Sequence, residues 1–138
     1  VMAQRKQQAG PAKGERTPAK DERIPHSGPI RDNGPPPRVS MTGRCIDAGA
    51  APLGNYTVIS QTNGQPDTIR YPKNTGECGP LTLVCLDVIG RPIPGTTAVL
   101  EKGHSLRQYS ANGGRTHSIA FYCTKKDQGG ACQIEFDR

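Results

Sequence analysis

Five cysteines are the residues of this chain best suited to chemistry: Cys45, Cys78, Cys85, Cys123 and Cys132. Zinc sites favour C-x2–4-C or H-x3–5-H spacings, and thiol redox sites favour C-x-x-C. The closest cysteines here are separated by six and by eight residues, and the histidines fit no ligand pair. The spacing therefore predicts structural cysteines, with no metal site and no cofactor.

Several disulfide pairings are compatible with the sequence. Cys123 and Cys132 lie at the inner ends of two predicted strands, so they can bond if these strands pair. Cys78 and Cys85 bracket a Gly-Pro turn, and a bond of either with Cys45 or Cys123 fits as well as a bond between the two. Since the count is odd, one thiol stays free or pairs between chains. A loop of roughly 30–80 residues closed from Cys45 would contribute about 3–5 kcal/mol.

Nucleophilic catalysis requires a nucleophile, a base and an orienting group. Within the predicted β domain, the pairs His104-Ser105 and His117-Ser118 place a base next to a nucleophile in the sequence. Adjacent strand residues point to opposite faces, so neither pair is expected to form a side-chain hydrogen bond. The Gly-Gly pairs also lack the Lys-Ser/Thr of a phosphate loop. We therefore expect no catalytic residues and no enzyme, and we retain a small hydrolase, assembled by the fold, as an alternative.

Positive charge is concentrated in residues 1–44, which hold nine Lys and Arg against four acids and seven of the thirteen prolines. Apolar residues there are too sparse to form an apolar face with the period of a strand or of a helix, so the segment is predicted to be a disordered basic arm. Its cations are candidates for binding a polyanion such as RNA or an anionic surface or glycan. They are Arg5, Lys6, Lys13, Arg16, Lys20, Arg23, Arg31, Arg38 and Arg44.

Residues 45–138 predict a small all-β domain, an antiparallel sandwich or barrel of about seven short strands. Turn residues such as Asn63-Gly64, Asn112-Gly113-Gly114 and Gly129-Gly130 separate short β-like runs, and no window shows a helical stripe. The predicted strands are residues 55–60, 67–71, 81–88, 96–100, 105–109, 117–123 and 132–136. Residues 81–88 are expected to form a central strand, because the side chains that point to either face of this strand are apolar.

Three segments resemble the six-cysteine extracellular domain that is abundant in nematode proteins. They are Thr68-Ile69-Arg70-Tyr71, Glu77–Cys85 and His117–Cys123, which together lie within residues 68–123. That family shows an extended T-I-x-Y run, two cysteines around a T-x-V-like strand, and a later strand that ends in cysteine. The resemblance implies a secreted module of unknown biochemical role.

We expect a secreted, non-enzymatic binding or effector-like protein whose partner is an unknown protein or an anionic surface or glycan. The alternative is a viral coat or nucleoprotein subunit in a virion or inside a cell, whose arm neutralises RNA. Asn55-Tyr56-Thr57 is an N-glycosylation triplet, meaningful only on the secretory route. A leader removed before Val1 would fit that route, and no apolar run is long enough to span a membrane.

Overall fold

The computed structural model of the protein describes residues 38–138, in which strands occur and helices do not. The strands are β1 (Arg38–Gly43), β2 (Cys45–Ile46), β3 (Thr57–Gln61), β4 (Asp67–Asn74), β5 (Leu81–Leu86), β6 (Ala98–Leu100), β7 (Gln108–Ala111), β8 (Ser118–Thr124) and β9 (Cys132–Asp137). Seven of them overlap the predicted strands, and β1 and β2 are additional. The prediction of a small all-β domain is confirmed.

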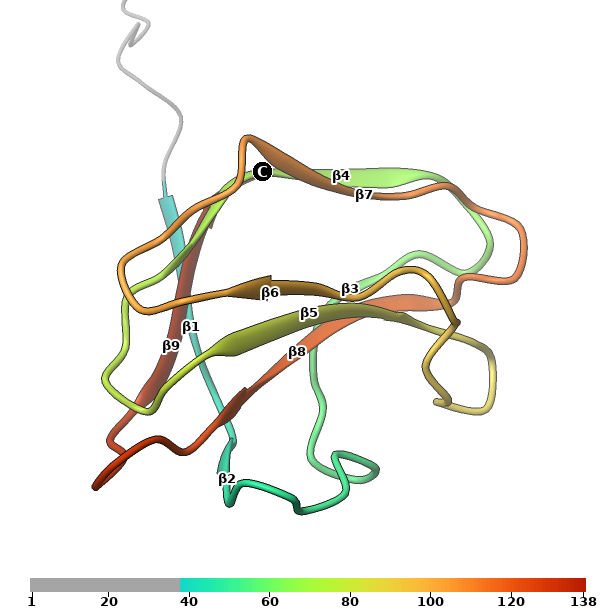
Figure 1. Cartoon of the computed structure of the whole chain (residues 1–138). Coiled ribbons are helices and arrows are strands. Elements are labelled where there is room, and N and C mark those ends of the chain that lie inside the picture. The colour runs from blue at the N-terminus through green and yellow to red at the C-terminus, as the bar shows by residue number, and fades with distance from the viewer. Residues whose placement is uncertain (1–37) are drawn as a thin grey trace, which may run out of the picture. The chain divides into compact units, whose positions relative to one another are not determined.

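The strands form two sheets that face each other (Figure 1). The first has the order β1-β9-β4-β7, and its pairs are antiparallel. The second has the order β2-β8-β5-β6, with β3 also paired to β8. Only the short β2–β8 pair is parallel, and it places Cys45 opposite Cys123. The connections β2–β3 and β5–β6 stay within the second sheet, and each of the other six carries the chain from one sheet to the other, an arrangement typical of a jelly roll.

Several turns that the sequence marks connect strands of different sheets, not paired neighbours. Asn63 and Gly64 adopt the expected positive φ angles of 50° and 86°. The strands on either side of them are nevertheless separate, because β3 pairs with β8 while β4 pairs with β7 and β9. Similarly, the two strands around Gly129-Gly130 do not pair with each other. Turn residues mark a change of direction, and they do not determine which strands become partners.

The core lies between the sheets, where alternate residues of each strand point inward. Its largest fully buried side chains include Phe121 of β8, Phe136 of β9 and Ile69 of β4. All six residues of β5 are buried, because this strand lies between β8 and β6 and its outward residues Val84 and Leu86 pack in a second cluster. The prediction that this segment is central is confirmed.

The predicted arm overlaps the folded domain in its last residues. Residues 1–37 of the arm lie outside the residues that the structure describes. Arg38–Gly43, however, form β1, which pairs with β9 over six residues from Arg38↔Asp137 to Gly43↔Cys132. The predicted boundary after residue 44 is therefore wrong at this point. Val39 and Met41 alternate with polar residues and pack against the core, a pattern too short to recognise in the sequence.

Asp67 connects the two sheets at the end of the domain where β3 leads into β4. Its carboxylate accepts hydrogen bonds from Ser60 Oγ of β3 at 2.6 Å and from Arg138 Nη1 at 3.1 Å. The backbone N–H of Thr68 donates to the other oxygen at 2.9 Å. Burial alone would raise the pKa of Asp67, but these hydrogen bonds and the charge of Arg138 outweigh it, so the pKa lies below its usual value.

Replacing Asp67 by Asn should destabilise the domain at neutral pH and much less in acid. A carboxyl whose pKa is lowered by folding adds stability above its unfolded pKa of about 3.9, and this stability is lost as the pH falls through the lower native pKa. We expect D67N to lower the free energy of unfolding by about 1–2 kcal/mol at pH 7, measured by urea denaturation with the disulfides intact.

The matched control is Asp47→Asn, because the side chain of Asp47 is 78% exposed and pairs only with Lys125 among the described residues. Its effect should stay within about 0.5 kcal/mol at both pH values. A loss for D67N that is equally large at neutral pH and below pH 3 would show that the ionised carboxylate is not what stabilises the link.

Candidate functional site

Two disulfides lie at the end of the sandwich opposite Asp67. Cys45 of β2 bonds to Cys78, with the Cα atoms 5.7 Å apart, and Cys123 of β8 bonds to Cys132 of β9, with the Cα atoms 5.6 Å apart. The second bond joins the two sheets, because β8 and β9 belong to different sheets. In the chain-entropy model, loops of these lengths stabilise a domain by roughly 4 and 3 kcal/mol. The disulfides therefore provide a large part of the stability expected for so small a core.

Four of the five cysteines form disulfides within the chain, and the fifth is a free thiol. Structural disulfides are confirmed, and Cys123 bonds to Cys132 although the strands that carry them do not pair. Among the open alternatives for Cys45, the partner is Cys78. Cys85 has a free thiol, 1% exposed, whose sulfur lies 3.4 Å from the Tyr109 hydroxyl. Burial, followed by this contact, raises the pKa of Tyr109.

The loop that carries Cys78 runs between β4 and β5 in close contact with the β8–β9 loop. The N–H groups of Glu77 and Cys78 both donate to the Ala131 carbonyl, at 2.9 and 3.0 Å. A side chain at Gly76 would collide with backbone atoms of Ala131 and Gln133. This glycine thus permits two backbones to approach closely enough for the disulfides to form around them.

Asn74 holds the same loop from inside the core. Its side chain is fully buried, and its Nδ2 donates to the carbonyls of Gly79 at 2.8 Å and Leu100 at 3.0 Å. Its Oδ1 accepts the N–H of Gly76 at 3.3 Å. One amide therefore satisfies three buried backbone groups, two in the β4–β5 loop and one in β6, and it holds this loop against the end of β6.

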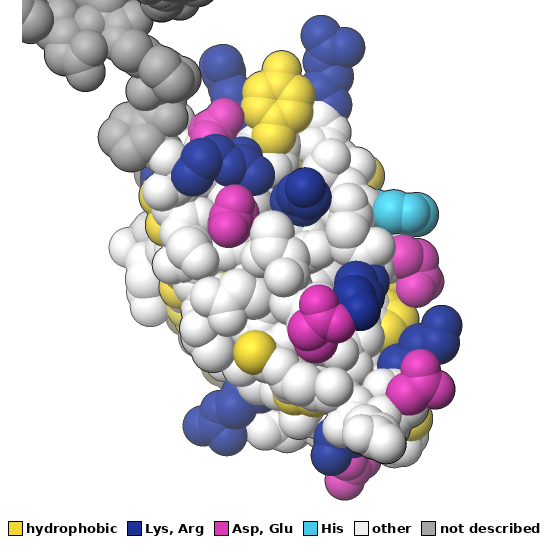
Figure 2. Space-filling model, turned by 90° about the vertical axis from the view of Figure 1, so that its left-hand side faces the viewer, with side chains coloured by type: hydrophobic (Ala, Val, Ile, Leu, Met, Phe, Trp, Pro, Cys, Tyr) yellow, Lys and Arg dark blue, Asp and Glu magenta, His cyan; other side chains and the backbone are white. Residues whose placement is uncertain are grey.

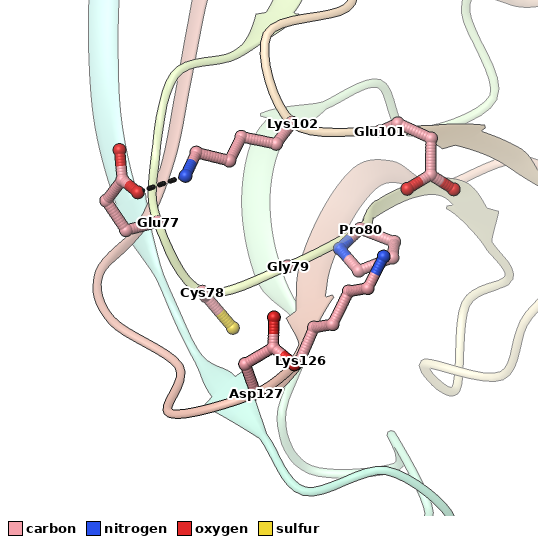
Figure 3. Close-up of a pocket in the computed structure, with 8 residues that line it drawn as sticks. All are labelled: Glu77, Cys78, Gly79, Pro80, Glu101, Lys102, Lys126 and Asp127. Carbon is pink, nitrogen blue, oxygen red and sulfur yellow. Dashed lines mark ion pairs between the residues drawn. The ribbon is translucent and has the colours of Figure 1, made fainter.

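A shallow pocket of about 170 Å³ opens on this surface, beside the Cys45–Cys78 bond (Figure 3). Its lining residues come from the Cys78 loop, the β6–β7 loop and the β8–β9 loop, and they are Glu77, Cys78, Gly79, Pro80, Glu101, Lys102, Lys126 and Asp127. Glu77 and Lys102 form an ion pair across one side. A second hollow of about 250 Å³ lies on the far side of this pair, lined by residues 73–77 and 102–103.

The chemistry available in this pocket suits binding more than covalent catalysis. The sulfur of its cysteine is already in a disulfide and is not a nucleophile. The acids and the two lysines offer charge for a small polar ligand, and no group of three or more His, Cys, Asp or Glu within residues 38–138 could hold a metal ion. His104 and Ser105 are exposed, and Ser118 is buried next to half-buried His117.

Two of the nine predicted polyanion-binding residues, Arg38 and Arg44, lie within the residues that the structure describes. Arg5, Lys6, Lys13, Arg16, Lys20, Arg23 and Arg31 lie outside those residues. Arg38 lies in β1, where its guanidinium is 3.2 Å from Asp137 and 3.9 Å from Glu135 and donates at 3.1 Å to the Tyr71 carbonyl. Arg44 is exposed between β1 and β2, and its carbonyl accepts the N–H of Cys123.

Asn55, the glycosylation candidate, lies at the end of the loop between β2 and β3. It is partly exposed, and its Nδ2 is 3.4 Å from the Ala51 carbonyl, a long and weak hydrogen bond. The next residue, Tyr56, packs edge-on against Tyr122, with ring centroids 5.6 Å apart. Burial, with a smaller contribution from Tyr122, raises the pKa of Tyr56.

Comparisons with known proteins identify no family for this chain. No family model matches it, and no curated protein sequence matches it. A solved structure from a study of Bacillus endospore appendages, described there as a novel family of disulfide-linked pili, is similar over 80% of this chain and 94% of that chain. The two are 15% identical with a TM-score of 0.47, a similarity too low to assign a function.

Replacing Asn74 by Ala should destabilise the disulfide-bonded end strongly. The change leaves two buried carbonyls without a donor and one N–H without an acceptor, each of which costs about 1–3 kcal/mol. We expect N74A to lower the free energy of unfolding by about 3 kcal/mol, measured by urea denaturation under non-reducing conditions.

Thr75→Val provides the control at the next position, because Thr75 Oγ1 is buried without a hydrogen-bond partner within residues 38–138. Removing this hydroxyl should be neutral or stabilising. A loss for T75V as large as that for N74A would mean that the loop tolerates no substitution, whatever its hydrogen bonds.

Proposed function

We propose that this chain is a secreted, non-enzymatic binding protein whose β domain is held together by disulfides. The observation that carries the proposal is the pair of disulfides at one end of a sandwich with a small core, one of which joins the two sheets. Such bonds persist in oxidising surroundings and are typical of small extracellular domains. The pocket beside them supports binding, because its charged side chains lie around a cysteine that has no free thiol.

No helix within residues 38–138 is long and apolar enough to cross a lipid bilayer. The likeness to the nematode six-cysteine extracellular domain, carried by residues 68–123, implies the same kind of secreted module and is part of this proposal. The strand between two cysteines and the later strand that ends in cysteine in that family would correspond here to β5 and to β8.

A coat or nucleoprotein subunit is the second candidate, and the strand order favours it. Jelly rolls of two sheets are common in viral capsid domains, although fold alone does not determine function. A basic arm of nine Lys and Arg in residues 1–44 precedes the domain in the sequence. This candidate requires that the chain assemble with RNA into particles of defined size, which electron microscopy of the mixture would detect.

A count of thiols in the chain isolated from its natural source tests the first proposal. Under denaturing, non-reducing conditions we expect one reactive thiol per chain, that of Cys85, and five after reduction. In the native state even this thiol should react slowly, because it is 1% exposed.

The variant Cys85→Ser serves as the control and should show no thiol before reduction. Five thiols in the unreduced wild-type chain would instead mean that the protein resides in a reducing compartment. The secretion proposal would then fail, and the nucleoprotein candidate would become the better one.

A further inference from the structure

Tyr71 occupies an unusual position in β4, inside a β-bulge between Arg70 and Lys73. On the β9 side, Arg70 is opposite Asp137 and Lys73 is opposite Glu135, so three steps along β4 match two steps along β9. The bulge interrupts the alternation of the strand, and Arg70 and Tyr71 are consecutive exposed residues. Bulges of this kind redirect side chains and occur often near functional sites. Here the bulge turns an aromatic ring to the solvent, where Tyr71 is 50% exposed.

The backbone conformation of Tyr71 is unfavourable for its residue type. Its φ angle is 50°, in the left-handed region that glycine favours and bulky residues avoid. The next residue is Pro72, which normally restricts its predecessor to extended conformations. The other non-glycine residues with positive φ within residues 38–138 are Asn63 and Asp127, which tolerate this region well. Such strain is stored where it serves a function more often than elsewhere.

Two hydrogen bonds hold Tyr71 in this conformation. Its N–H donates to the Arg107 carbonyl at 2.9 Å, and its carbonyl accepts from Arg38 Nη1 at 3.1 Å. Pro72, which follows it, is fully buried and anchors the strand. The half-exposed ring is therefore presented on a backbone that is held at both its N–H and its carbonyl.

Several exposed cationic residues lie close to Tyr71 in the fold, on β4 itself and on the segment whose backbone it contacts. Arg70 and Lys73 are exposed on β4, and Arg107 is exposed just before β7. The nearby acids Glu135 and Asp137 both lie within 4 Å of Arg38. Within residues 38–138, neither Arg70 nor Arg107 forms an ion pair. Figure 2 shows Lys and Arg side chains next to a hydrophobic group at the upper end of this side of the molecule, with acidic side chains between them.

We propose that Tyr71 and its neighbours Arg70, Lys73 and Arg107 form a binding site for single-stranded nucleic acid. Bases of a single strand stack on exposed aromatic rings, and cations beside the ring contact the phosphates. A duplex hides the faces of its bases and cannot stack in this way. A sulfated glycan would use the same cations but gains less from the ring, so the observations favour the nucleic acid. The proposal goes beyond the secreted binding role, since it holds in any compartment.

The test uses the full chain and a fluorescently labelled oligo(dT) of about 15 nucleotides, with affinity measured by fluorescence anisotropy. Tyr71→Gly removes the ring and relieves the backbone strain, so it should bind about 5- to 150-fold more weakly while its Tm does not fall. Tyr71→Phe keeps the ring and should bind within twofold of the wild type. Tyr71→Asn, which also tolerates positive φ, replaces Tyr71→Gly if the glycine variant fails to fold.

Two controls separate this site from general attraction between charges. Leu53→Gly removes another exposed apolar side chain and should not change the affinity. Arg107→Gln should weaken binding and lower its salt dependence more than Arg115→Gln, whose arginine is exposed in the β7–β8 turn. Wild-type affinity for oligo(dT) in both Tyr71→Gly and Tyr71→Asn would overturn the proposal. The proposal would also be overturned if these variants lost as much affinity for heparin as for oligo(dT), because the site would then be assigned to sulfated glycans.

A spectroscopic readout is independent of affinity. The chain contains no tryptophan, so Tyr71→Trp introduces a single one at the proposed site. Stacking of a base on this ring should quench its fluorescence when oligo(dT) is added, whereas a duplex of equal length should quench it much less. Binding of oligo(dT) without quenching would show that the strand does not contact the ring. A thiol count that contradicts secretion would leave these results unaffected.

Discussion

The two sulfur bonds at one end of the sandwich are the constraint on which the rest of this structure depends. Four connections cross between the sheets at that end, and the loop that carries Cys78 contacts the β8–β9 loop there through backbone hydrogen bonds. Loops of this kind have few apolar side chains to hold them. Covalent bonds, together with the buried amide of Asn74, replace the packing that a larger core would supply.

The strands were largely predictable, because each is a short β-like run between turn residues. Leu81–Leu86 could be recognised as a central strand, since apolar side chains on both of its faces must be buried against other parts of the protein. The pairing of strands could not be predicted in the same way. In this fold most consecutive strands belong to different sheets, so the turn at Asn63-Gly64 separates two strands that are not partners. Local residues determine a turn, whereas the partners depend on the whole topology.

The candidate site was predictable only in part. The sequence offered a bond between Cys123 and Cys132 only on the condition that their strands pair, whereas the geometry that brings them together is a contact between sheets and not a hairpin. The importance of Tyr71 left no signal in the sequence. Its exposure depends on a bulge against β9, a strand more than sixty residues away, and on a backbone conformation that its residue type disfavours. In the sequence it is simply one aromatic residue of a β-like run.

The burial of Cys85 has a consequence for the fidelity of oxidation. A free thiolate can attack an existing disulfide and exchange partners with it, and the rate depends on the access of the attacking sulfur. Cys85 lies in β5 beneath the Thr96 and Tyr109 side chains, and its neighbour in the strand order is β8, which carries Cys123. Once the sandwich has folded, the buried thiol of Cys85 can neither exchange with the two disulfides nor form a bond with a second molecule. The folded domain thereby preserves its own bonding pattern without a sixth cysteine.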